Sequence, residues 1–151
     1  MKKFAFLSII ALASCSLGAH AQSEIYPSHF DLNEVTLLDS PFKTAMDTNN
    51  RLLLQYDVDR LLTPYVRQSG LGATTDTQNR YYKWEANHPS FDNWGNSSFN
   101  LDGHVGGHYL SALALAYAAS SDETVKKAMK ERMEYMLEVM KDCQDAFDND
   151  T

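Results

Sequence analysis

Residues 101–120 read LDGHVGGHYLSALALAYAAS, and this stretch decides how the chain folds. It is apolar on nearly every helical face, which is typical of a helix buried on most sides. It also carries two histidines four residues apart, His104 and His108. Residues i and i+4 lie on one face of a helix, so the two imidazoles project side by side. Because an unpaired buried polar group is costly, these rings need a partner.

Three kinds of partner stay open for the histidine pair: a metal ion, a substrate or another side chain. The spacing is one that zinc uses on helices. The metalloprotease signature requires glutamate directly after the first histidine, where this chain has Val105, so that class is excluded. Asp102 or Glu85 could supply a carboxylate ligand. Three glycines accompany the pair and predict a close approach of the backbone to a ligand or to another helix; they are Gly103, Gly106 and Gly107.

The residues after this stretch predict a long amphipathic helix. Ser120 to Glu123 read as a capping box at its start. One apolar stripe then repeats every three or four residues, formed by Val125, Met129, Met133, Met136, Met140, Cys143 and Phe147. An apolar inner helix backed by an amphipathic outer helix favours an all-α fold, in particular a two-layered helical toroid.

Upstream, a first helix is predicted from an N-cap at Ser40 and a proline at Pro41 as far as Tyr56. The pattern weakens at 57–59, and Pro64 predicts the start of a short second helical piece that ends near Gln68. Residues 22–35 predict an extended N-terminal arm with at most one short strand.

Residues 71–100 have no clean periodicity but hold six aromatic residues: Tyr81, Tyr82, Trp84, Phe91, Trp94 and Phe99. Disordered segments are poor in aromatics, so we expect an ordered loop at a functional site. Trp84 stands directly before Glu85, and a ring beside a carboxylate is typical of sugar sites. A plain packing role for Trp84 stays equally open.

The N-terminus predicts export. Lys2 and Lys3 precede an apolar run, and Ala19-His20-Ala21 forms a small-residue cleavage site, so residues 1–21 read as a signal peptide. Leu12 to Cys15 also resembles a lipobox, which would leave a lipidated Cys15. Either way the protein is expected outside the cytoplasm, periplasmic or extracellular, and on the membrane only if Cys15 is lipidated.

Charge and cysteine usage narrow the possible partners. The formal net charge is −7, and loss of the two lysines of residues 1–21 would make it −9. An acidic surface disfavours nucleic acid and anionic lipid, while neutral sugars remain compatible. Cys143 is the sole cysteine after residue 21, so neither an internal disulfide nor a cysteine-based structural zinc site is expected.

Several motifs together resemble one group of proteins. The runs FDLNEVTLLDSPF, YDVDRLLTPY, QSGL and WEA, then LDGHVGGHYLSALALAYAAS and CQDAF, are similar in content and order to bacterial β-L-arabinofuranosidases of glycoside hydrolase families 127 and 146. The resemblance covers residues 30–147. It implies that residues 22–151 are the N-terminal fragment of an (α/α)6 catalytic domain, with β-sandwich domains downstream.

The resemblance also implies a function. Members hydrolyse terminal β-L-arabinofuranose residues of plant glycans with retention, using a zinc-bound cysteine thiolate as nucleophile and a glutamate as acid/base. Those residues lie downstream of this chain, and Cys143 does not match the nucleophile motif, so the chain alone is expected to be inactive. Positions matching the distinctive motifs are expected to contact the arabinose-containing oligosaccharide: His104, His108, Asp102, Trp84 and Glu85.

Two other functions stay open at this point. The chain could be an exported, non-catalytic carbohydrate-binding module, or a helical interaction domain that binds no ligand.

Overall fold

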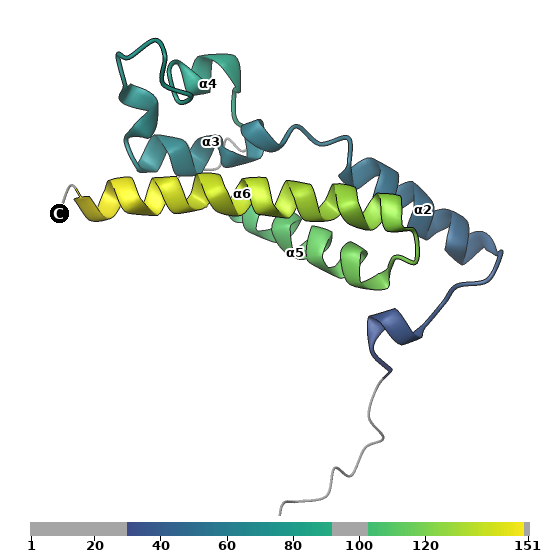
Figure 1. Cartoon of the computed structure of the whole chain (residues 1–151). Helices are drawn as coiled ribbons and strands as arrows, with labels where there is room; N and C mark the ends of the chain where they lie inside the picture. Colours follow the sequence, from purple (N-terminus) through teal and green to yellow (C-terminus); the bar gives the residue numbers. More distant parts are fainter. Residues whose placement is uncertain (1–29, 92–102, 150–151) are drawn as a thin grey trace, which may run out of the picture. The chain divides into compact units, whose positions relative to one another are not determined.

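The computed structural model describes residues 30–91 and 103–149. The chain divides into two compact units, Met1–Phe30 and Asp31–Thr151, and the second contains every helix described below. Its elements are η2 (Leu32–Glu34), α2 (Pro41–Leu53), α3 (Val58–Gln68), η3 (Leu71–Ala73), α4 (Trp84–Asn87), α5 (His104–Ala119) and α6 (Glu123–Asn149) (Figure 1). The described residues contain helices and no strand, which confirms the predicted all-α class. In its described part, residues 30–35, the predicted arm carries the short helix η2 and no strand.

α2 begins where its capping residues predict. The Ser40 side chain accepts a hydrogen bond from the backbone N–H of Lys43 at 3.3 Å, and Pro41 occupies the first turn. The helix ends at Leu53 rather than continuing to Tyr56. Its buried residues are Asn50 and Leu53, while Phe42 in its first turn is 76% exposed.

The prediction that a short helix starts at Pro64 is wrong. α3 begins at Val58, because the Asp57 side chain caps it by accepting from the backbone N–H groups of Asp59 and Arg60. Pro64 lies inside the helix, where it lacks the N–H that would bond to the carbonyl of Arg60. The helix continues because its buried face packs against α6.

α5 and α6 form an antiparallel hairpin joined by a short turn (Figure 1). The cap of α6 is Asp122 rather than the predicted Ser120. Its Oδ1 accepts from the backbone N–H of Thr124 at 2.8 Å and of Val125 at 3.2 Å. The Ser120 hydroxyl instead accepts from the backbone N–H of Asp122 at 3.1 Å, so it fixes the turn before the helix.

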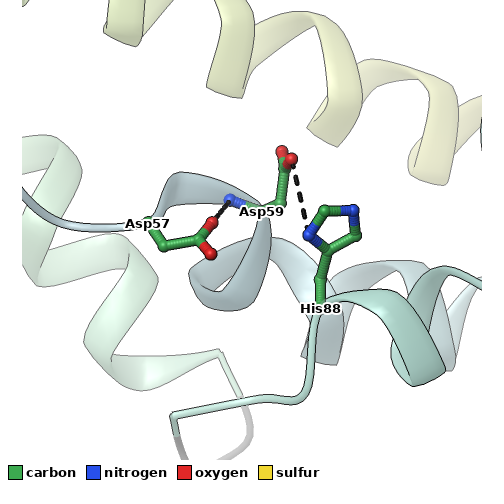
Figure 2. A group of neighbouring side chains, drawn as sticks. All are labelled: Asp57, Asp59 and His88. Carbon is green, nitrogen blue, oxygen red and sulfur yellow. Dashed lines mark hydrogen bonds and ion pairs between the residues drawn. The ribbon is translucent and has the colours of Figure 1, made fainter.

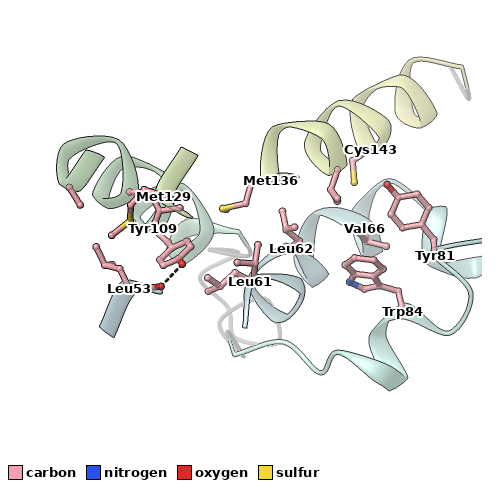
Figure 3. Packing of buried hydrophobic residues seen from close by; sticks show 14 residues of the cluster. Leu53, Leu61, Leu62, Val66, Tyr81, Trp84, Tyr109, Met129, Met136 and Cys143 are labelled. Atoms are coloured by element: carbon pink, nitrogen blue, oxygen red, sulfur yellow. Dashed lines mark hydrogen bonds between the residues drawn. The ribbon is translucent and has the colours of Figure 1, made fainter. Parts of the chain in front are cut away.

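The core lies where α6 packs against α3 and α5 (Figure 3). Met129, Met136 and Cys143 of the predicted stripe are buried, whereas its last member, Phe147, is 60% exposed. Val139 is fully buried although it lies off that stripe. It faces the core because α6 packs against two helices at once, which widens its buried face.

α5 is covered on one side within the described residues. Gly106, Tyr109, Leu113 and Ala116 are buried, while Leu115 is 60% exposed. The predicted burial on most sides is therefore not seen in this part of the chain. Within the described residues α5 packs mainly against α6, with further contacts to η2, α2 and α3.

The aromatic segment is folded as far as the structure describes it. Tyr81 and Trp84 belong to the core, and Trp84 begins α4. Residues 92–102, which include Trp94, Phe99 and Asp102, lie outside the described residues. Among the described helices, none is long and apolar enough to cross a lipid bilayer.

Candidate functional site

The two histidines of the first turns of α5 form a pair. Nε2 of His104 and Nε2 of His108 are 3.1 Å apart, and the ring centroids are 4.4 Å apart at 83°. Both side chains are exposed. At this distance the two ring nitrogens form a hydrogen bond, with one as donor and the other as acceptor. The predicted side-by-side projection is confirmed, and the predicted burial of the rings is wrong.

Two glycines allow α3 to support the start of α5 at close range. Gly103 has φ +84°, and a Cβ there would lie 3.0 Å from Cζ of Tyr65. A Cβ on Gly106 would lie 3.0 Å from Cε2 of Tyr65 and 3.1 Å from the carbonyl oxygen of Leu61. The Tyr65 hydroxyl donates to the carbonyl of Gly103 at 2.7 Å, and burial raises its pKa, so the phenol keeps its proton. The close backbone approach at these two glycines is therefore to another helix.

Gly107 differs from the other two glycines. It is exposed, and among the described residues a Cβ placed there would meet just one atom within 4 Å, the Tyr65 hydroxyl at 3.9 Å. By helical geometry it lies beside His104, His108 and Ser111 on the exposed face of α5. We call these four residues the histidine strip. The missing side chain at Gly107 leaves room for a ligand to approach the rings.

Trp84 occupies a core position. It is 4% exposed, its indole N–H donates to the Thr63 hydroxyl at 3.1 Å, and its ring packs against Tyr81 and His88 at centroid distances of 5.4 and 4.9 Å. It also lines a pocket of about 270 Å³ together with Glu85. The packing interpretation of Trp84 thus has direct support.

Glu85 lies at the surface and binds Arg67 of α3. The Arg67 Nη2 lies 2.6 Å from Oε1, and Nε lies 3.1 Å from both carboxylate oxygens. This bidentate pair fixes α4 on α3. Trp84 and Glu85 therefore contact α3, whereas His104 and His108 contact each other on α5. Asp102, the remaining predicted site residue, lies outside the described residues.

A second polar cluster lies at the start of α3 and consists of Asp57, Asp59 and His88 (Figure 2). Asp57 and Asp59 stand close together in the sequence, whereas His88 does not. Asp57, Asp59 and His88 offer three potential metal-ligand atoms within 4.8 Å of one another. However, the Asp57 carboxylate caps α3, and Asp59 accepts from the Tyr135 hydroxyl at 2.6 Å while lying 3.7 Å from Nδ1 of His88. These carboxylates already bind groups of the protein, so the cluster joins α3, α4 and α6. His88 gives no sequence signal, since it stands 29 residues from Asp59.

The zinc that the sequence resemblance implies does not fit Cys143. This residue is 7% exposed, and burial raises the pKa of its thiol, whereas zinc binds the thiolate. Among the described residues, the one group of three potential ligands does not include it. Cys143 is a core residue of α6.

Comparison with known proteins gives one match. The family model described as Beta-L-arabinofuranosidase, GH127 catalytic domain, matches residues 34–150. No curated protein and no solved structure matches the chain.

Proposed function

Because the chain belongs to the GH127 β-L-arabinofuranosidase catalytic-domain family, a family of glycoside hydrolases, we propose that it is the N-terminal part of an exported enzyme. The enzyme releases terminal β-L-arabinofuranose from plant glycans with retention of configuration. Residues 22–151 would form the first helices of its (α/α)6 catalytic domain, and residues 1–21 would be removed on export.

The observation that carries this proposal is the exposed histidine strip. Imidazole nitrogens donate or accept hydrogen bonds, and two imidazoles side by side on one exposed helix face suit neighbouring sugar hydroxyls. The two rings contact each other, and among the described residues a Cβ on Gly107 would meet just the Tyr65 hydroxyl, at 3.9 Å. We assign His104, His108 and Asp102 to sugar contact, with Trp84 and Glu85 as supporting positions.

The residues described here hold and orient the sugar and carry out no bond-breaking step. No nucleophile or acid/base is assigned among them, since Cys143 is buried with its thiol protonated. Zinc and its ligands would come from other parts of the enzyme.

The test is hydrolysis of p-nitrophenyl β-L-arabinofuranoside by the complete gene product. We expect His104→Ala and His108→Ala each to lower kcat/KM by about 10- to 100-fold, because each removes a hydrogen bond to the sugar worth about 1.4–2.8 kcal/mol. Gln144→Ala, an exposed change on α6, serves as the matched control and should leave kcat/KM unchanged. Unchanged kcat/KM in folded histidine variants would contradict the assignment.

Export has a separate test. Mass spectrometry of the protein recovered from its native host should find Gln22 at the N-terminus. A lipidated Cys15 would instead support the lipobox alternative, and an intact Met1 would contradict export.

A non-catalytic carbohydrate-binding module is the second candidate function, because the described residues offer sugar contacts without a nucleophile. It predicts that the complete gene product binds arabinosides but does not cleave them. Turnover of the nitrophenyl substrate that is lost with chelation of zinc would exclude it.

A further inference from the structure

A pocket of about 430 Å³ lies between α2 and the turn that joins α5 to α6, away from the histidine strip. Ser120 lies at the end of α5 opposite the histidines, and twelve residues separate it from His108, which corresponds to about 18 Å along a helix. The volume falls within the range of small-molecule sites, roughly 300–1,000 Å³.

A buried carboxamide without a partner lines this pocket. Asn50 is 5% exposed. In the part of the chain that the structure describes, its side chain makes no hydrogen bond, although its backbone carbonyl accepts from the N–H of Leu54 at 3.1 Å. A buried amide without a partner costs about 1–3 kcal/mol, so such groups normally have a ligand or a bound water.

The opposite wall supplies further hydrogen-bonding groups. Ser120 is 8% exposed, and its hydroxyl lies in the turn together with Ser121. Gln55 adds a second carboxamide at the end of α2. Donors and acceptors therefore line the pocket from both α2 and the α5–α6 turn.

The charges of the pocket cancel. Two cations, Lys43 and Arg51, and two acids, Asp47 and Asp122, line it. Lys43 and Asp47 form an ion pair at 2.5 Å, and the Asp122 carboxylate caps α6. A site with no net charge has no electrostatic preference for an ion.

Apolar groups complete the lining, namely Met46, Leu54 and Val125. Carboxamides and hydroxyls beside an aliphatic surface match a ligand that combines hydroxyl groups with C–H faces. We propose that this pocket binds one neutral sugar unit, at a site separate from the histidine strip. The inference rests on the pocket itself and not on the proposed hydrolase function.

The experiment is an NMR titration of the isotope-labelled full chain with L-arabinose, and separately with D-galacturonate as an anion of similar size. We expect L-arabinose to cause saturable shifts of the Asn50 side-chain amide and the Ser121 backbone amide. Galacturonate should bind at least about tenfold more weakly, a difference of about 1.4 kcal/mol.

Substitutions assign the binding to the pocket. Asn50→Leu should weaken L-arabinose binding at least about tenfold without loss of thermal stability, because it replaces an unsatisfied buried amide with an apolar group of similar size. Gln55→Leu, at an exposed position, should weaken binding without any folding risk. Asn49→Leu, on the exposed side of the same helix, is the matched control.

The double variant His104→Ala/His108→Ala should retain these shifts, which separates this site from the proposed active-site strip. The proposal is overturned if L-arabinose gives no saturable shifts at Asn50 up to about 100 mM. It is equally overturned if binding survives both Asn50→Leu and Gln55→Leu, or if galacturonate binds more tightly.

Discussion

Tyr109, next to His108, shows how a single side chain joins the elements that support the candidate site. Its hydroxyl donates to the carbonyl of Leu53 at 2.5 Å and accepts from Nη1 of Arg132 at 3.1 Å. Arg132 also donates to the carbonyls of Leu54 and Tyr56, so it satisfies free carbonyls after α2. Burial raises the pKa of Tyr109, which keeps the phenol protonated as a donor.

Tyr109→Phe should therefore destabilise the protein by about 1–2 kcal/mol, because the Leu53 carbonyl and Arg132 lose a buried partner. Urea denaturation measures this change. Tyr82→Phe, at a partly exposed position, is the matched control and should shift the free energy of unfolding by less than about 0.5 kcal/mol. Equal effects of the two substitutions would show that the buried hydroxyl contributes nothing specific.

Cys143 gives a prediction about reactivity and pH. Burial raises the pKa of its thiol, so the folded protein holds this proton more tightly than the unfolded chain does. Stability from this group is complete below the ordinary thiol pKa, roughly 8.5, and falls as pH rises above it. At pH 8, iodoacetamide should alkylate the folded protein at least about tenfold more slowly than the urea-unfolded chain. Rapid alkylation of the folded protein would contradict the buried position.

At the scale of elements, the start of α5 depends on its contact with α3. Gly103→Ala and Gly106→Ala should each cost about 1–3 kcal/mol, because each Cβ would meet the Tyr65 ring at 3.0 Å. Gly107→Ala is the matched control, since its Cβ would make an ordinary contact with the Tyr65 hydroxyl at 3.9 Å and alanine favours helices by about 1 kcal/mol. The three melting temperatures check this order, and a loss at Gly107 as large as at Gly106 would contradict it.

Capping and proline signals in the sequence predicted a helix boundary correctly where one side chain sets that boundary. They failed where packing against a distant helix sets it. Ser40 and Pro41 placed the start of α2 because a cap and a fixed φ act within one turn. The predicted helix start at Pro64 was wrong, because the contacts of α3 with α6, which is distant in sequence, outweigh one missing hydrogen bond. The packing role of Trp84 and the burial of the Asn50 side chain likewise depend on neighbours from other elements, so the local sequence could not predict them.

At the scale of the whole molecule, the helix order and the family follow from motifs that the sequence itself displays. The match over residues 34–150 confirms the family that the GHVGGHYLSA stretch indicates. The candidate site was less predictable. Helical spacing paired His104 with His108, but apolar residues stand on both faces of α5, so the sequence does not tell exposed Leu115 from buried Leu113.

The most direct test of the proposed function is a crystal structure of the complete gene product bound to L-arabinofuranose. Our account predicts a ring nitrogen of His104 or His108 within about 3 Å of a sugar hydroxyl. A sugar bound with both imidazoles covered by protein, or an imidazole pair that holds a metal ion instead, would contradict it.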